Sequence, residues 1–356
     1  MPLSEPAFVA SRGDIVRSAE DITVVICTRE HPDGLDRCLK SVMRQRFPKF
    51  SVLVVDNAPQ STAASTVVAQ FSGDPVKVDY VLEPRPGLAR ARNRALDSLR
   101  TGIAAWIDDD EVADPFWLAE LSRGFASHPD AAAVSGIMLP AELETQPQVW
   151  FEQYGGHHKH RGFTPTMFSP ESATEQSPLY PLPPFGTGGN MALRLDAVHE
   201  IGGFVTSLGA GTWSLGGEDT RIFTELLLAG KSVVYQPTAI THHYHRRSRR
   251  QLRRQMYGYG VGLTAFYLDV LVSRPASLVS LLRLAPHVMH DARGPTSLRS
   301  GDLPPDFPSD LRWANRLGLL AGPGRYAAAR ISGRRQARRA RLGGTSQVRR
   351  APRFGE

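Results

Sequence analysis

Short apolar runs alternate with amphipathic stretches along the first third of the chain. Two β-branched runs, 22–27 and 52–55, each end in polar residues, and between them 35–45 carries apolar side chains at helical spacing. The same order returns with strand-like runs at 78–82 and 103–107 and a helical stretch at 88–99. Near-continuous apolar strands joined by helices are typical of a parallel sheet covered on both faces. The pattern predicts an α/β fold with polar residues at the carboxyl ends of its strands.

The pattern loosens after Pro115. A stretch at 154–184 is rich in Gly, His, Pro and Ser and predicts a long loop over a site, because loops of this length in compact domains are usually functional. Beyond Arg246 the spacing is helical and basic, 294–310 has the composition of a linker, and an arginine-rich tail follows. The other predicted elements are helices at 116–125, 191–201 and 220–229 and strands at 132–139 and 232–235.

Composition is that of a soluble globular protein, with 41% hydrophobic and 22% charged residues among 356. The net charge of +7 is gathered in two basic runs, 242–254 and 325–353, which predicts attraction to an anionic partner. Two cysteines, Cys27 and Cys38, do not indicate a disulfide framework and favour a reducing, cytoplasmic compartment. We expect no signal peptide and no spanning helix, since the nearest candidate, 261–284, is broken by two charged residues and a proline.

Four consecutive carboxylates, Asp108 to Glu111, follow the last of the early strands. Adjacent carboxylates repel one another, so their accumulation at a strand end favours a compensating cation. Asp108 and Asp110, spaced i and i+2, point the same way in an extended segment and can face one hard divalent ion. An acidic cap for the next helix is the alternative, but Asp114 before Pro115 already serves that purpose. The cluster therefore predicts a metal site.

Two further polar motifs have more than one interpretation. Glu218 and Asp219 follow two glycines and open a helical stretch, where a carboxylate either caps the helix or takes a proton from an acceptor hydroxyl. His243 and His245 share one face of an extended segment, either as metal ligands or as part of an anion-binding surface. The residues alone do not decide either case.

Two glycine-containing segments are equally open. Residues 86–93 begin a helix with a glycine and arginines, which either bind a diphosphate or lie on an exposed amphipathic surface. Residues 185–190 form either a tight turn before a helix or a floor against which a substrate lies. Neither segment points to one chemistry by itself.

Taken in order along the chain, these motifs resemble the family-2 glycosyltransferases of GT-A fold, and the resemblance covers 22–259. It implies an α/β fold with a single Rossmann-like sheet sandwiched by helices and a C-terminal helical, basic extension. The implied divisions are an N-terminal tail at 1–20, a catalytic domain at 21–245 (nucleotide-binding half 21–115, acceptor half 116–245), a helical membrane-peripheral segment at 246–293, and a linker with an arginine-rich tail at 294–356.

The resemblance also implies roles for individual residues. Asp219 would be the catalytic base, with Glu218 beside it. Asp110, Asp108 and His243 would hold Mn²⁺ or Mg²⁺. The implied contacts to the nucleotide sugar are Thr28, Arg29, Glu30, Asp56, Arg92, Asn93, Asp108 and Asp109. The implied contacts to the sugar or acceptor are Gly188, Gly189, Asn190 and Trp213.

The implied reaction is a single displacement from a nucleotide-diphosphate sugar, with UDP favoured, to a hydroxyl of a glycan, glycolipid or natural product. The metal would neutralise the leaving diphosphate while Asp219 takes the proton of the acceptor. The segment 250–260 lacks the Gln-x-x-Arg-Trp motif of processive synthases, which argues for transfer of one sugar at a time.

Two other functions compete with this one. A nucleotidyltransferase acting on sugar phosphates would carry a glycine-rich, basic loop directly after the first strand, where this chain has Thr28-Arg29-Glu30-His31. A non-catalytic polyanion-binding protein would explain the basic tail but not the carboxylates, so we expect no specific nucleic acid. The tail and the amphipathic region before it predict peripheral contact with the anionic inner face of the cell membrane, the alternative being a disordered solubilising tail.

Overall fold

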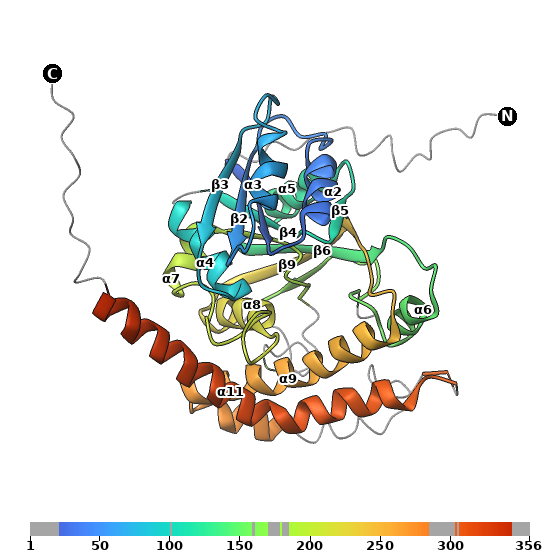
Figure 1. Cartoon of the computed structure of the whole chain (residues 1–356), viewed down its shortest axis with the longest axis vertical. Helices are drawn as coiled ribbons and strands as arrows, with labels where there is room; N and C mark the ends of the chain where they lie inside the picture. Colours follow the sequence, from blue (N-terminus) through green and yellow to red (C-terminus); the bar gives the residue numbers. More distant parts are fainter. Residues whose placement is uncertain are drawn as a thin grey trace.

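Within the described residues, nine strands form one mixed sheet in the order β3-β2-β1-β4-β8-β6-β9-β5, with β7 paired to β9 off this path (Figure 1). The structure is a computed structural model that describes residues 21–99, 102–158, 161–169, 179, 185–284, 303–304 and 306–343, the last eight by backbone alone. The strands are β1 (Ile22–Thr28), β2 (Ser51–Asn57), β3 (Val78–Glu83), β4 (Ile103–Asp108), β5 (Glu111–Ala113), β6 (Ala131–Pro140), β7 (Thr166–Phe168), β8 (Asn190–Arg194) and β9 (Ser232–His243).

Helices cover both faces of this sheet, as the apolar runs predict. Val24 packs on one face with side chains of α2, α3 and α5, whereas its neighbour Val25 packs on the other face with side chains of α4, α7 and α8. The two layers arise because successive side chains of a strand point to opposite faces. The helices are α2 (Pro32–Val42), α3 (Ala63–Ala69), α4 (Leu88–Ser98), α5 (Trp117–Ser127), α6 (Gln146–Gln153), α7 (Leu195–Glu200), α8 (Glu218–Leu228), α9 (Arg249–Ser273) and α11 (Ser309–Gly343).

The second half of the sheet differs from the prediction in two places. The segment 191–201, predicted as a helix, is β8 followed by the short helix α7, because β8 inserts antiparallel between β4 and β6 and is buried there. The strand predicted at 232–235 is also too short, since β9 continues to His243 and pairs with β6 and β5. Part of the predicted loop at 154–184 is β7, which pairs with β9.

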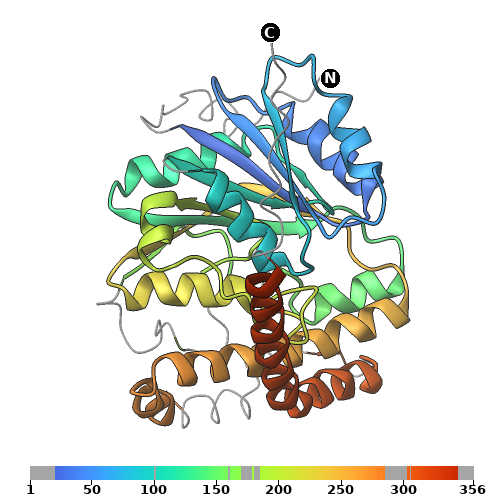
Figure 2. The ribbon, with the colours of Figure 1, turned by 60° about the vertical axis from the view of Figure 1, so that its left-hand side comes forward.

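A helical layer formed by α9 and α11 lies beyond α8, away from β1–β3 (Figures 1 and 2). Two glycines allow the close approach of these helices, because a Cβ on Gly260 would meet the backbone of Asn315 and one on Gly318 would meet the carbonyl of Tyr257. Pro323 lies inside α11, which turns in its second half (Figure 1).

The basic C-terminal stretch is therefore helical over 309–343 and its first half packs on α9, where the sequence predicts a linker and tail. Alanine and arginine, which dominate 325–343, are strong helix formers, and the glycine contacts hold the first half of the helix on α9. The predicted N-terminal tail, residues 285–302 and the last thirteen residues lie outside the described part of the chain. In the described part, no helix combines the length and the apolar character needed to cross a membrane.

The parallel strands β1, β2 and β4 bring three predicted polar residues to one edge of the sheet. β1 lies between the other two, with Thr28 opposite Asp56 on β2 and Cys27 opposite Asp108 on β4. Because the carboxyl ends of parallel strands meet at the same edge, the predicted crevice forms there. Cys27 and Cys38 are both free thiols.

Candidate active site

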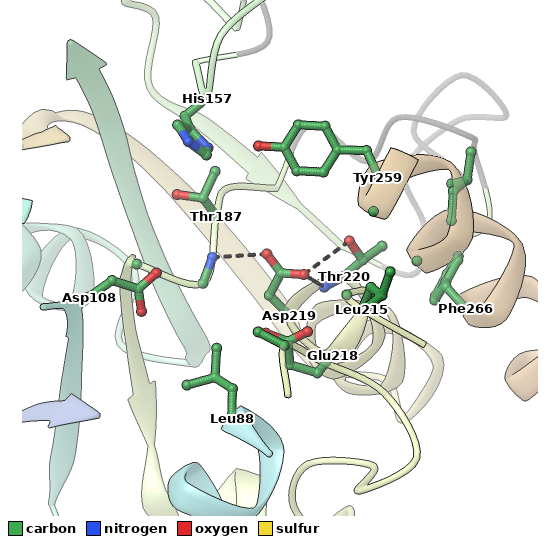
Figure 3. A pocket seen from close by; sticks show the side chains of 18 of the residues that line it. Leu88, Asp108, His157, Thr187, Leu215, Glu218, Asp219, Thr220, Tyr259 and Phe266 are labelled. Carbon is green, nitrogen blue, oxygen red and sulfur yellow. Dashed lines mark hydrogen bonds between the residues drawn. The ribbon is translucent and has the colours of Figure 1, made fainter. Parts of the chain in front are cut away.

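Two cavities meet at Asp108. The first, about 430 Å³, is lined by residues at the carboxyl ends of β1, β2 and β4, and we call it the strand-end cavity. The second, about 320 Å³, lies between the loop before β8, the start of α8 and one side of α9, and we call it the α8–α9 cavity (Figure 3). Leu88, Asp108 and Ala210 line both cavities, so they form one continuous site.

The aspartates at the end of β4 and in the turn after it face different partners. Asp109 accepts a hydrogen bond of 2.6 Å from the Thr28 hydroxyl and lies 3.3 Å from the ring of His31. Oδ2 of Asp110 lies 3.3 Å from Nε2 of His243. A turn at residues 109–110 spreads these side chains, so the extended geometry assumed for Asp108 and Asp110 is wrong, although both still line the strand-end cavity.

Burial and neighbouring charge separate the pKa values of these carboxyls. Burial raises the pKa of Asp108 to about 6, against the opposing effect of the Arg92 guanidinium. Burial would also raise the pKa of Asp110, but the charge that His243 carries when its ring is protonated, followed by that of Arg246, lowers it to about 2. Asp110 is therefore an anion near neutral pH, whereas Asp108 takes up a proton at a higher pH than Asp110 does.

Glu111, the fourth carboxylate, is enclosed behind this turn. It is 1% exposed, and neither of its oxygens has a hydrogen-bond partner among the described residues. Burial, followed by the charge of Asp108, raises its pKa well above the usual value. A Cβ on Gly189 would collide with this carboxyl group and approach Asp108 to 2.8 Å, so only glycine fits at that position.

Arg92 joins both sides of the site from below. This arginine of α4 is 2% exposed, and its guanidinium lies 3.1 Å from Glu218 and 3.5 Å from Asp108 and donates to the carbonyl of Gly188. Its charge is thus already matched by protein groups. Burial, together with the charge of Asp219, raises the pKa of Glu218 to about 7, against the lowering effect of Arg92.

Asp219 occupies the first turn of α8 and points into the α8–α9 cavity (Figure 3). Its Oδ2 accepts a hydrogen bond of 3.1 Å from the backbone N–H of Gly188, and its Oδ1 accepts one of 2.7 Å from that of Thr220. A carboxylate is favoured at a helix start, where it lies close to the positive end of the helix dipole. Gly217 occupies the N-cap position of α8 and no side chain caps it, whereas Asp219 faces the cavity from the first turn, so the role of Asp219 as a base stays a prediction.

A line of hydrogen-bonded side chains leads away from Asp110. Beyond His243, its Nδ1 lies 2.8 Å from Nδ1 of His245, and Nε2 of His245 lies 2.8 Å from Glu152 on α6. The pKa of Glu152, which burial alone would raise, is lowered to about 2 by hydrogen bonds from His158 and His245. His157 packs edge-on against the ring of His243, with 4.4 Å between ring centroids.

Most predicted site residues line one of the two cavities. The strand-end cavity gathers Thr28, Arg29, Glu30, Asp108, Asp109 and Asp110. The α8–α9 cavity gathers Arg92, Asp108, Gly188, Gly189, Glu218, Asp219 and His243.

Four predicted contact residues line neither cavity. The amide of Asn93 is fully used by the backbone N–H and carbonyl of Phe204. The amide of Asn190 is buried, accepting from the indole of Trp117 and donating to two backbone carbonyls. Both asparagines therefore hold the fold, and their predicted substrate contacts are not supported.

The other two, Asp56 and Trp213, differ in their exposure to solvent. Asp56 is 1% exposed and accepts a hydrogen bond of 2.6 Å from the hydroxyl of Tyr80, so it lies beneath the strand-end cavity. Its neighbour Asn57 lines that cavity instead. Trp213 is 54% exposed on the surface, where the guanidinium of Arg325 lies 5.8 Å from its ring.

Several cavity residues have no counterpart in the sequence prediction. Tyr259 and Phe266 of α9 and Asn315 of α11 line the α8–α9 cavity, as do His157 and Arg161 from the segment after α6. No local motif marks these residues, because helix packing and chain return bring them to the site. The composition of 154–184 was the signal that pointed to this region.

The chain is similar to proteins of a known family. Residues 23–202 match the family described as Glycosyl transferase family 2. The chain is 30% identical to the succinoglycan biosynthesis protein ExoM of Rhizobium meliloti over 225 residues, 62% of this chain and 66% of that protein. It is 26% identical to the glucosyl-dolichyl phosphate glucuronosyltransferase of Haloferax volcanii over 193 residues, 53% of this chain and 57% of that protein. The matched region thus spans less than two thirds of either relative.

The fold is also found among solved structures. The crystal structure of S. aureus TarS matches with a TM-score of 0.50 at 14% identity, covering 70% of this chain and 40% of that one. The predicted α/β fold of GT-A type, with one central sheet, helices on both faces and a helical C-terminal extension, is confirmed.

Proposed function

The chain belongs to glycosyl transferase family 2, and we propose that it moves one sugar from a nucleotide-diphosphate sugar to an acceptor hydroxyl with inversion. One observation carries the proposal. The carboxylate of Asp219 faces the α8–α9 cavity, while Asp108 lines that cavity where it joins the strand-end cavity (Figure 3). This arrangement supports the proposal because a carboxylate suited to act as the base and the strand-end cavity lie on two sides of one continuous space.

Asp219 acts as the base in this proposal. The acceptor oxygen forms a bond to the anomeric carbon while the bond from that carbon to the diphosphate oxygen breaks. The acceptor proton passes to Asp219, and the bonding electron pair leaves with the nucleotide diphosphate. No covalent enzyme intermediate is needed, and the hydrogen bonds from Gly188 and Thr220 hold the carboxylate in one orientation.

The nucleotide occupies the strand-end cavity. Ligands of open α/β sheets bind at the carboxyl ends of the strands, and Thr28 and Asn57 bring polar groups to that edge. Arg29 and Arg246 supply positive charge at the same cavity. Arg92 is excluded from direct phosphate binding in this scheme, because Glu218 and Asp108 already neutralise it.

The donor set at the junction fits a divalent cation. Asp110 and His243 lie 3.3 Å apart, Asp108 lines the cavity of each, and a carboxylate oxygen with an imidazole nitrogen are acceptable ligands for Mn²⁺ or Mg²⁺. A cation bound there would neutralise the departing diphosphate. The protein prepares the site by keeping Asp110 ionised and enclosing it beneath Arg246.

The acceptor is a hydroxyl compound held against α9. The ring of Tyr259 offers aromatic surface in the α8–α9 cavity, with its hydroxyl directed toward the interior (Figure 3). Aromatic faces with nearby hydrogen-bonding groups suit glycans, glycolipids and ring-bearing natural products. The absence of a Gln-x-x-Arg-Trp motif from 250–260 supports transfer of one sugar at a time, with Asp219 at the transfer point.

The outer face of α11 is suited to peripheral contact with the anionic inner face of the cell membrane. Trp313, Leu317 and Leu320 are 57%, 49% and 78% exposed and form one stripe at i, i+4 and i+7, opposite the face that packs on α9. Arg312 and Arg316 are exposed on the same turns. An apolar stripe flanked by arginines suits insertion among anionic headgroups.

A donor screen by nucleotide release tests the proposed function. Purified protein would be offered UDP-, GDP- and dTDP-sugars with Mn²⁺ or Mg²⁺ and pooled lipid-linked and soluble acceptors. We expect release from one nucleotide class, with UDP-sugars first, and loss of release in chelator. Transfer that persists in chelator with Asp110→Asn would overturn the metal assignment.

A further inference from the structure

Four side chains form an unbroken line from the start of β5 to α6. Asp110 Oδ2 lies 3.3 Å from His243 Nε2, the two histidine Nδ1 atoms are 2.8 Å apart, and His245 Nε2 is 2.8 Å from Glu152 Oε1. The line is enclosed, since His243 is 5% and His245 4% exposed. The proposed reaction assigns no role to His245 or Glu152.

The direction of each hydrogen bond follows from the outer end of this line. Ionised Glu152 can only accept, so Nε2 of His245 must carry the proton that it donates. A histidine that ligates a metal is neutral, and with both rings neutral His245 has its lone pair on Nδ1 and accepts from Nδ1–H of His243. The lone pair of His243 is thereby left on Nε2, the atom that faces Asp110.

Two acceptors then face each other across 3.3 Å. A carboxylate oxygen and an imidazole lone pair repel at this distance unless a positive charge lies between or beside them, and the guanidinium of Arg246, 3.3 Å from the same Asp110 oxygen, supplies one beside them. Asp110 and His243 would hold a divalent cation that supplies a second such charge.

The surroundings keep this line rigid. The ring of Phe151 packs edge-on against His245 with 4.7 Å between centroids, and Phe151 is 2% exposed. The second oxygen of Glu152 lies 3.1 Å from the ring of His158, which fixes the carboxylate without joining the line to His243. This arrangement provides a comparison residue on the same carboxylate.

We propose that Glu152 and His245 are positioning residues that hold His243 in the tautomer presenting its Nε2 lone pair to the divalent cation. The inference rests on the proposed function, because the cation belongs to it. Neither residue touches the substrate; both act through His243. Outer partners of metal-bound histidines commonly change metal affinity by about 10–100-fold.

The three neighbouring histidines also allow a different arrangement. One nitrogen each of His157, His243 and His245 lie within 4.8 Å of one another, a spacing that suits a separate metal ion. Such an ion would have to take a nitrogen of His245 from either Glu152 or His243, because both nitrogens are already hydrogen-bonded. The favoured assignment therefore keeps His245 as a support for His243.

Binding of Mn²⁺ to the donor-free full chain, followed at fixed pH by the EPR signal of the free ion, tests this inference. We expect one ion per chain, with Kd raised about 10–100-fold in Glu152→Gln and in His245→Gln. The double variant should bind as weakly as either single variant, since both break the same line. His158→Gln should stay within about threefold of wild type, and circular dichroism checks that all variants fold.

The outcomes separate this inference from the proposal beneath it. Unchanged Kd in Glu152→Gln and His245→Gln, with tight binding by wild type, would overturn the positioning role alone. No Mn²⁺ binding by wild type would overturn both the metal assignment and the inference. One tight ion retained in Asp110→Asn but lost in His245→Gln would assign the histidines to a separate metal site.

Discussion

The backbone N–H of Gly188 donates a 3.1 Å hydrogen bond to the carboxylate of Asp219. This bond joins the loop before β8 to the first turn of α8, two segments that 31 residues separate in the chain. It leaves the carboxylate facing the α8–α9 cavity in a fixed orientation (Figure 3). The proposed base is therefore oriented by the loop that forms one wall of the cavity.

Replacing the proposed base should stop chemistry without unfolding the protein. Asp219→Asn keeps an oxygen for the Gly188 N–H but cannot take the acceptor proton, so we expect kcat to fall about 10²–10⁴-fold. Nucleotide release with saturating donor and acceptor measures this. Asp196→Asn is the matched control, because Asp196 is an exposed carboxylate in the first turn of α7 that bonds the next backbone N–H in the same way. Normal turnover in Asp219→Asn would show that the base lies elsewhere.

The buried guanidinium below the site should matter for folding. Arg92→Met leaves Glu218 and Asp108 without their shared cation, and loss of one partner of a buried pair typically costs about 3–5 kcal/mol. Urea denaturation measures the loss. Arg94→Met on the same helix removes one hydrogen bond to a backbone carbonyl and should cost less than about 1 kcal/mol. Equal stability of the two variants would contradict the bracing role of Arg92.

Two glycines of α11 should respond oppositely to alanine. Gly318→Ala places a Cβ against the carbonyl of Tyr257, so we expect about 1–3 kcal/mol of destabilisation as α11 moves off α9. Gly324→Ala meets open space and should stabilise the helix by about 0.5–1 kcal/mol. Thermal unfolding compares the pair. A similar gain in both variants would mean that α11 does not pack closely on α9.

The ion pairs of Glu225 on α8, with Arg221 on the same helix and with Arg274 at the end of α9, give a pH-dependent contribution to stability. Burial would raise the pKa of Glu225, but hydrogen bonds from Arg274 and Arg221 lower it below its usual value. A carboxyl with a lowered folded-state pKa contributes stability above its unfolded-state pKa, and that contribution is lost as pH falls through the folded-state value. Glu225→Gln should thus cost about 1 kcal/mol at pH 7.

The same comparison at acid pH checks the sign. The difference between wild type and Glu225→Gln should shrink as pH falls below about 4.5 and then vanish. Glu200→Gln, at an exposed pair with Lys231, should change stability by less than about 0.5 kcal/mol at every pH. A difference that grows in acid would show that Glu225 is not held as an anion.

The membrane proposal makes its own prediction. Leu320→Asp puts a charge in the exposed stripe of α11, so binding to vesicles of phosphatidylglycerol and phosphatidylcholine should fall at least about tenfold in a flotation assay. Leu143→Asp, 48% exposed in the loop after β6, is the control for a surface charge away from the stripe. If both variants float with vesicles as well as wild type does, the membrane contact does not lie on this stripe of α11.

The sequence anticipated one edge of the site well. Thr28 and Asp108 end apolar strands, and parallel strands necessarily bring such ends to a common edge. The prediction was wrong where a polar residue follows the expected motif but its side chain points into the core and not into a cavity. Asn190 ends a glycine-rich segment, yet its amide is consumed by Trp117 and two carbonyls inside the core. Local spacing carries no information about that orientation.

Contacts between distant segments were beyond the reach of periodicity. Glu152 meets His245 across 93 residues, and nothing in the local sequence of α6 distinguishes this glutamate from a surface one. The helix α11 was hidden for a different reason. Its arginines have the composition of a tail, and the glycines that seat it on α9 are weak helix formers by themselves.

The sequence by itself determined the strands β1 to β4, the helices α2 and α4 and the acidic segment at the end of β4, because periodicity and strand ends are local properties. Only the tertiary structure decided which polar groups face the cavities. It enclosed Arg92 between two carboxylates, turned Asn93 and Asn190 into structural amides, and left Asp219 facing the α8–α9 cavity. The physical reason is that burial obliges each polar group to find a partner, and packing selects the partner from anywhere along the chain.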